Sequence, residues 1–155
     1  MKSHFINRLG FDDRERKVKY AFDHCFPTTL YHVRASEYKP VTWIDSAGDA
    51  WTFNKSFWSD RGSIPNFLHC LCEPDTFLIP FYFHDSACRF KGLHKNGVFH
   101  PLTRLECDAM LRQWVLDSDG TTWQAEGIYR GVRLGAALGI GGNWGAGDLR
   151  KQLQK

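Results

Sequence analysis

The centre of the chain reads Phe83-His84-Asp85-Ser86-Ala87-Cys88-Arg89. Two further polar clusters flank it, Ser59-Asp60-Arg61-Gly62-Ser63-Ile64-Pro65 before it and Thr103-Arg104-Leu105-Glu106-Cys107-Asp108-Ala109-Met110-Leu111 after it. Each cluster combines acidic or imidazole side chains with an arginine, and each is set in apolar sequence. The stretch from Asp60 to Asp108 is therefore more typical of a site than of a solvated surface.

The central cluster is predicted to be helical. Pro80 suits the first turn of a helix that covers residues 81–90, because proline is tolerated where the backbone N–H has no partner within the helix. On such a helix His84, Asp85 and Cys88 lie near one another. Residues 91–100 contain two glycines and several charges, and we expect a loop there.

Two more helices are expected after this loop. Thr103 and Glu106 match a capping box, in which each side chain satisfies a free backbone N–H. The apolar residues that follow predict an amphipathic helix ending near Asp117. A last helix is expected from about Thr122 to Ile140, where a glycine at every fourth position leaves a ridge that another backbone can approach closely.

The N-terminal part of the chain has the pattern of a β-sheet. Alternating faces over residues 30–34 predict a strand, and Pro27 favours a turn or a sheet edge before it. Two β-rich runs, residues 41–45 and 50–53, surround a short connection of small and acidic residues and predict a hairpin. We therefore expect an α+β fold, a small N-terminal antiparallel sheet of hairpins followed by about three packed helices.

The length of 155 residues predicts a single domain, residues 1–155, large enough for a hydrophobic core. Residues 1–17 turn from apolar to strongly charged, and they fit an N-terminal arm or a first strand. Residues 141–155 form a predicted flexible tail rich in glycine, whose Trp144 either lies over the domain or grips a partner. Aromatic residues make up 15% of the chain, which is simplest to interpret as a core rich in aromatic rings.

Bulk charge and cysteine content narrow the class of protein. The net charge is +3, and basic residues are interspersed with acidic ones, whereas a nucleic-acid binder more often shows a one-sided basic stripe. No apolar run is long enough to span a bilayer, and no secretory signal is expected. The five cysteines follow no regular framework, which predicts reduced thiols and synthesis in the cytosol.

One imidazole and three carboxylates could together bind a metal ion. The candidate ligands are Asp60, His84, Asp85 and Asp108, a donor set that suits a divalent ion such as Zn²⁺, Mn²⁺, Fe²⁺ or Mg²⁺. Such an ion could acidify a bound water for hydrolysis. His84, Asp85 and Arg104 are then the candidate catalytic residues, since an arginine can stabilise developing negative charge.

The same residues also have a purely structural interpretation. His84 fits a buried, hydrogen-bonded core histidine. Cys88 lies one turn from His84, so a thiolate–imidazole pair is conceivable, although a small buried thiol is the commoner outcome. The helices offer three pairs of opposite charge at i,i+4 spacing: Asp85–Arg89, Arg104–Asp108 and Asp108–Arg112. Both interpretations stay open at the level of the sequence.

The order and spacing of these motifs resemble a family of bacteriophage and prophage proteins, the domain of unknown function thirteen fifty-three. The likeness covers about residues 41–140. It rests on the residues Asp60, Ser63, Pro65, His84, Asp85, Arg104 and Asp108 and on the segment Ile128-Tyr129-Arg130-Gly131-Val132-Arg133. Ser59 stands where the family usually has Thr, and Ser86-Ala87-Cys88 stands where Tyr-Leu-Tyr usually follows His-Asp.

The resemblance implies a phage or prophage origin and synthesis in the cytoplasm of a bacterial host, but it implies no activity. We expect a virion or assembly-associated component that contacts itself or other phage structural proteins. As a virion component it would be incorporated in the particle. The alternative is a small metal-dependent hydrolase that acts on the cell wall during phage entry or lysis. An inhibitor directed at the host is a third, weaker alternative.

Overall fold

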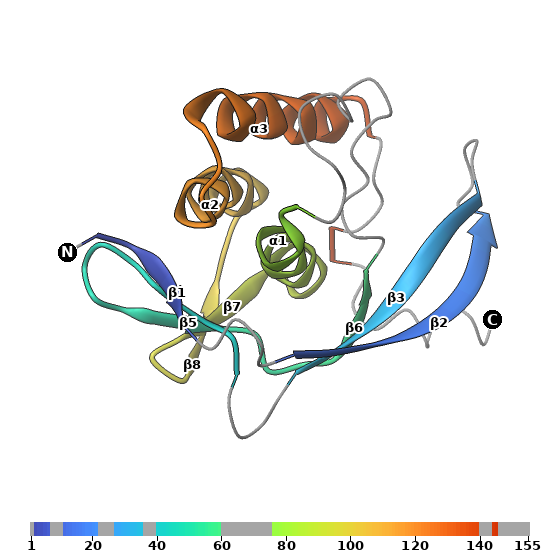
Figure 1. Cartoon of the computed structure of the whole chain (residues 1–155), viewed down its shortest axis with the longest axis horizontal. Helices are drawn as coiled ribbons and strands as arrows, with labels where there is room; N and C mark the ends of the chain where they lie inside the picture. Colours follow the sequence, from blue (N-terminus) through green and yellow to red (C-terminus); the bar gives the residue numbers. More distant parts are fainter. Residues whose placement is uncertain are drawn as a thin grey trace.

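The computed structural model describes residues 2–6, 11–21, 27–35, 40–59, 76–139 and 144–145. The elements in these ranges are β1 (His4–Ile6), β2 (Phe11–Ala21), β3 (Pro27–Ala35), β4 (Thr42–Ile44), β5 (Ala50–Thr52), β6 (Phe57–Ser59), α1 (Leu78–Phe90), β7 (Gly92–Lys95), β8 (Val98–Pro101), α2 (Arg104–Asp117) and α3 (Thr122–Ala137). The predicted α+β fold, an antiparallel sheet combined with three helices, is confirmed for these residues (Figure 1).

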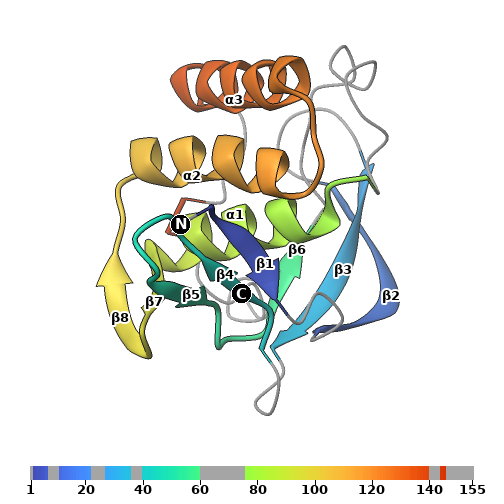
Figure 2. The same cartoon turned by 60° about the vertical axis from the view of Figure 1, so that its left-hand side comes forward.

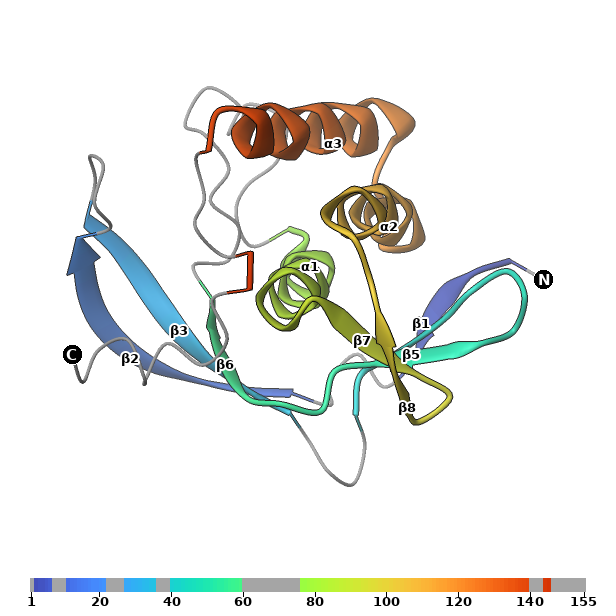
Figure 3. The same cartoon turned by 180° about the vertical axis from the view of Figure 1, so that it is seen from behind.

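The described strands form two antiparallel sheets. One has the strand order β1-β4-β5-β7-β8, and the other has the order β2-β3-β6. The long β2 and β3 strands extend to one side of the helices, and β7 and β8 lie on the opposite side (Figures 1 and 3). Residues 4–6 are thus a first strand, paired with β4, and Pro27 is the first residue of β3.

The predicted hairpin of β4 and β5 is confirmed, and Asp45 holds its turn. The Oδ1 atom of Asp45 accepts hydrogen bonds from the backbone N–H groups of Ala47 and Asp49, both at 2.9 Å. Its Oδ2 atom accepts from the indole N–H of Trp51 at 2.9 Å. Burial raises the pKa of Asp45, but these hydrogen bonds outweigh it, so the pKa lies below its usual value.

The prediction of a loop over residues 91–100 is wrong, because this segment forms the hairpin of β7 and β8 and extends the first sheet through β5. Lys91 has a φ of 55° and ends α1, so the chain turns directly into β7. Asn96 and Gly97 form the turn with φ values of 51° and 80°. An Asn-Gly pair favours this two-residue turn, and that signal outweighs the charges around it.

Gly92 is required where β7 leaves α1. A Cβ atom at this position would lie 2.3 Å from the carbonyl oxygen of His100, which is backbone and cannot rotate away. We expect Gly92→Ala to lower the free energy of unfolding by roughly 1–3 kcal/mol, measured by urea titration. Gly97→Asn is the control, because nothing lies within 4 Å of an added Cβ and Asn tolerates the positive φ. An equal loss in both variants would contradict the steric argument.

The three helices stack in tiers on the sheets, with α1 nearest the strands, α2 on α1 and α3 outermost (Figure 2). The capping box of α2 is confirmed, because the Thr103 hydroxyl accepts from the N–H of Glu106 at 3.2 Å. The helix ends at Asp117 as predicted. The last helix begins at Thr122 as predicted and ends at Ala137, three residues early. No helix in the described ranges is long and apolar enough to cross a bilayer.

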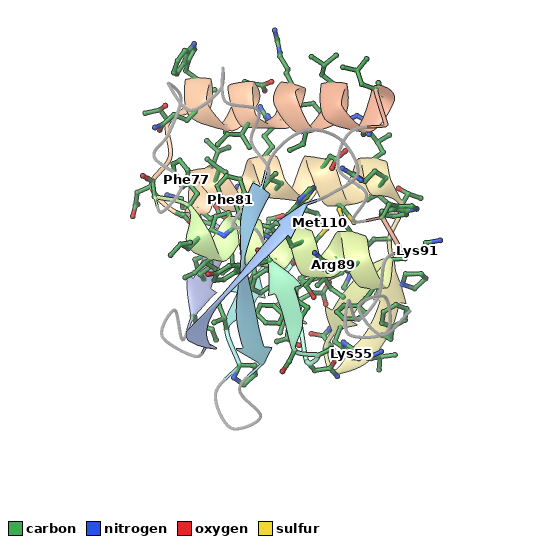
Figure 4. All side chains as sticks on the ribbon, turned by 90° about the vertical axis from the view of Figure 1, so that its right-hand side faces the viewer. Lys55, Phe77, Phe81, Arg89, Lys91 and Met110 are labelled. Atoms are coloured by element: carbon green, nitrogen blue, oxygen red, sulfur yellow. The ribbon has the colours of Figure 1, made fainter. Side chains whose placement is uncertain are left out.

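The core is built from aromatic rings, as the composition predicts. Phe83 of α1 packs edge-on against Phe53 at 5.1 Å and against Trp114 of α2 at 5.4 Å, between ring centroids. Trp114 also meets Trp43 of β4 at 5.8 Å. Phe77 and Phe81 lie at the start of α1, and Arg89 lies near its other end (Figure 4). The rings thus fix α1 between the sheet and α2.

Trp144 lies over the domain, the first of the two alternatives predicted for the tail. It is partly buried against the core, and the ammonium group of Lys91 lies 5.8 Å from its ring centroid. The next residue, Gly145, donates its backbone N–H to the carbonyl oxygen of Cys88 at 2.9 Å. These contacts place Trp144 and Gly145 against the C-terminal end of α1, and the other residues of the tail lie outside the described ranges.

Candidate functional site

Asp108 on α2 connects the three described helices. Its side chain has no solvent exposure. Its Oδ1 atom accepts hydrogen bonds from Nε2 of His84 on α1 at 2.7 Å and from Nε of Arg104 on α2 at 3.2 Å. Its Oδ2 atom accepts from Nη1 of Arg133 on α3 at 3.0 Å. One buried carboxylate is therefore surrounded by an imidazole and two guanidinium groups, which we call the Asp108 cluster.

The charges of the cluster determine its protonation. Burial raises the pKa of Asp108, but the hydrogen bond and charge of His84 and the two arginines outweigh this, so the pKa lies below its usual value. Burial lowers the pKa of His84, yet Cys88 and the Asp108 carboxylate raise it to about 10. At neutral pH the cluster therefore contains an imidazolium bound to a carboxylate.

Two buried cysteines adjoin the cluster. The Sγ atom of Cys88 lies 3.5 Å from Nε2 of His84, and Cys88 and Cys107 are both free and buried. A hydrogen bond to the Cys107 thiol raises the pKa of Cys88, and burial raises it further, although His84 acts in the opposite direction. In the metal-free protein Cys88 is consequently a thiol, the commoner of the two outcomes considered from the sequence.

The geometry does not match a nucleophilic Cys–His–Asp relay. In such a relay the carboxylate holds one ring nitrogen of the histidine and the nucleophile addresses the other. Here Asp108 and Cys88 both contact Nε2 of His84. A proton cannot pass from the thiol through the ring to the carboxylate in this arrangement. The thiol and the carboxylate instead converge on the same ring nitrogen.

The predicted site residues are only partly brought together. His84, Arg104 and Asp108 meet in the cluster. The carboxylate of Asp85, which is also buried, accepts a hydrogen bond from the hydroxyl of Ser59 at the end of β6. Asp60 lies outside the described residues. His84 and Asp85 point in different directions because adjacent helix residues are about 100° apart.

The ion pairs predicted at i,i+4 spacing have different outcomes. The pair of Arg104 and Asp108 is confirmed at 3.2 Å. Arg112 pairs with Glu126 of α3 at 2.5 Å instead of with Asp108. The contact of Arg133 with Asp108 was missed, because no spacing rule connects residues on different helices.

A third buried carboxylate, Asp117 at the end of α2, connects this helix to the sheet. It accepts hydrogen bonds from the hydroxyl of Ser3 at 3.0 Å, from the indole N–H of Trp43 at 2.7 Å and from the side-chain amide of Gln113 at 2.9 Å. Sequence reasoning used Asp117 only as the end of the helix. Its neutral partners and full set of hydrogen bonds are typical of a structural residue.

Donor atoms of His84, Cys88 and Asp108 all lie within 4.8 Å of one another, and the three residues are buried. This group could hold a metal ion. It retains His84 and Asp108 from the predicted ligands and adds Cys88. A pocket among the described residues lies elsewhere, between residues 53–55 of the β5–β6 connection, Ser86 and Phe90 of α1, and the β7–β8 hairpin.

Comparison of the chain with family models, with curated proteins and with solved structures found no match. The resemblance to the phage family therefore stays a prediction that rests on the motifs themselves. What the chain can do has to be argued from its own geometry.

Proposed function

We propose that this chain is a non-enzymatic virion or assembly-associated component of a bacteriophage or prophage, in which the Asp108 cluster holds the helices in one arrangement. One observation carries the non-enzymatic part of the proposal. Both oxygens of Asp108 are occupied by cationic side chains from the three described helices, and the carboxylate has no exposed surface. The phage assignment rests on the resemblance of the motifs.

A structural role agrees with the energetics of the cluster. A buried carboxylate is costly unless it is paired and hydrogen-bonded, and a fully satisfied buried network favours one arrangement of the elements that contribute to it. Arg133 reaches Asp108 from α3, the outermost helix, with 38% of its side chain exposed. The cluster therefore extends from α1 to the outermost helix tier and fixes the tiers relative to one another.

The surface offers places for contacts between subunits. β8 is at the edge of the first sheet, and its Val98 and Phe99 are 72% and 47% exposed. An edge strand with apolar side chains is a ready template for pairing with another chain. Trp123 and Leu134 of α3 are 65% and 50% exposed, and Leu138, which follows the helix, is 62% exposed. Self-association or contact with other phage structural proteins would cover such residues.

The assembly role predicts that Val98→Lys/Phe99→Lys abolishes self-association, measured by light scattering coupled to size exclusion over a range of concentrations. Lysine on an edge strand opposes strand pairing. Ala47→Lys/Ala109→Lys adds the same charge at two exposed positions outside the edge strand β8 and is expected to associate like wild type. In parallel, mass spectrometry of purified particles is expected to detect the chain. A monomeric wild type that is also missing from particles would contradict the proposal.

A metal-dependent hydrolase is the second candidate, and the convergence of His84, Cys88 and Asp108 favours it. In that role a bound divalent ion would acidify water and Arg104 would stabilise negative charge. The test is release of fragments from purified cell wall with Zn²⁺, Mn²⁺, Fe²⁺ or Mg²⁺ added singly. Release of cell-wall fragments that depends on one of these ions, and that is lost in His84→Gln, would favour the hydrolase over the structural role.

A further inference from the structure

The donor atoms of His84, Cys88 and Asp108 converge between α1 and α2, within 4.8 Å of one another, and the buried thiol of Cys107 adjoins them at Cys88. His84 and Cys88 lie four residues apart on α1, so they share a face of the helix. Cys107 and Asp108 are adjacent on α2, and both are buried where that helix packs on α1. The Cys107 thiol hydrogen-bonds the Cys88 thiol, which itself contacts Nε2 of His84. A Cys₂HisAsp set is thus assembled from two helices.

The separation of His84 from Cys88 matches that of two ligands in a tetrahedral zinc site, and the separation of His84 from Asp108 is shorter. Zinc–nitrogen and zinc–sulfur bonds of about 2.05 and 2.3 Å place the two donor atoms about 3.5 Å apart at the tetrahedral angle. The separation of His84 Nε2 from Cys88 Sγ is 3.5 Å. The separation of His84 Nε2 from Asp108 Oδ1 is 2.7 Å, so this pair has to open by about 0.7 Å to reach tetrahedral spacing.

The donor set selects among metals. Thiolate and imidazole ligands suit Zn²⁺, whereas Mg²⁺ and Ca²⁺ prefer sites built from oxygen atoms. Two thiolates and one carboxylate around Zn²⁺ carry a net charge of −1, which Arg104 and Arg133 at Asp108 would offset. The two arginines, which would repel a cation bound by neutral ligands, therefore complement this particular complex.

We propose that His84, Cys88, Cys107 and Asp108 form a closed zinc site that cross-links α1 and α2. Four protein ligands leave no open position for water, which is the form of a structural rather than a catalytic zinc site. Binding would stabilise the folded chain in proportion to zinc affinity. This site differs from the ligand set expected from the sequence, since it excludes Asp85 and uses two thiols. It does not depend on the proposed assembly role.

The test uses the full chain, purified without a metal-affinity tag, reduced and stripped of metal. Titration with Co²⁺ as a spectroscopic substitute is expected to give visible bands of tetrahedral cobalt and a near-ultraviolet thiolate-to-cobalt band that saturate at one ion per chain. Zn²⁺ is expected to displace Co²⁺ completely. Elemental analysis of untreated protein is expected to find zinc near one equivalent.

A matched background identifies the thiols. In Cys25→Ser/Cys70→Ser/Cys72→Ser, the remaining cysteines are Cys88 and Cys107, and the full cobalt spectrum is expected to persist. Adding Cys88→Ser or Cys107→Ser to this background should remove about half of the thiolate band. His84→Gln should weaken zinc binding by about 100-fold or more, because losing even an outer-shell partner costs 10–100-fold.

Three results would overturn the proposal. One is no cobalt binding by the stripped, reduced wild type that circular dichroism shows to be folded. Another is cobalt binding without a thiolate band. The last is loss of the band in the triple serine background while that variant remains folded, since the thiols would then lie outside α1 and α2. None of these results bears on whether the chain associates or enters particles, so the two proposals fail separately.

Discussion

Replacing Asp108 with Asn is expected to destabilise the chain by about 3–5 kcal/mol, the range found when one partner of a buried ion pair is removed. The substitution keeps the shape of the side chain but removes the charge that His84, Arg104 and Arg133 share. Three cationic groups would then repel one another around a neutral amide. Urea unfolding in the presence of a chelator measures the effect on the metal-free protein, and an unchanged m-value would show that the stability has changed and not the compactness of either state.

Glu126→Gln is the matched control for this experiment. Glu126 also links α2 to α3, through Arg112. Both side chains of this pair are more than a third exposed, at 39% for Arg112 and 35% for Glu126. An ion pair of that kind contributes about 0–1 kcal/mol. If both variants lost the same small amount of free energy of unfolding, the ion pairs of Asp108 would contribute no more than exposed ones. The Asp108 cluster could then not be what holds the helices in one arrangement.

The fold class could be predicted because its signals are local. The capping box at Thr103 and Glu106 sets the start of α2 without any information from the rest of the chain. The β4–β5 hairpin has its turn residues next to its strands. The β7–β8 hairpin also has a local signal, the Asn96-Gly97 pair, which favours a two-residue turn. The charges and glycines around that pair are typical of a loop, and they led to the wrong prediction.

The candidate site could be predicted only in part because its contacts cross between elements. His84 and Asp108 were identified, but nothing in the spacing of residues says that Arg133, 25 positions beyond Asp108, returns to it. Cys107, a ligand of the proposed zinc site, is not among the candidates from the sequence because it lies beside Cys88 only after α2 packs on α1. The helical spacing of His84 and Cys88 does bring the Cys88 thiol to attention in the sequence, but it contains no signal for Cys107.

A pH titration of stability isolates the role of His84. The pKa of His84 is raised from 6.5 in the unfolded chain to about 10 in the folded one. The stability that His84 contributes is thus fully present below pH 6.5, where the ring is protonated in both the folded and the unfolded chain. This stability is lost as the pH rises through about 10. Between these two pH values the folded chain holds one more proton than the unfolded chain. Each unit of rising pH therefore lowers the free energy of unfolding by at most about 1.4 kcal/mol.

Other groups titrate in the same range, so the expected result is a difference between variants. The free energy of unfolding of wild type minus that of His84→Gln, in the presence of chelator, should be largest near pH 6 and shrink steadily towards pH 10. Nuclear magnetic resonance of the imidazole should find His84 still protonated at pH 8. A ring that loses its proton near pH 6.5 would mean that Asp108 is held by its arginines alone, and that the link from α1 to the outer helices contributes little.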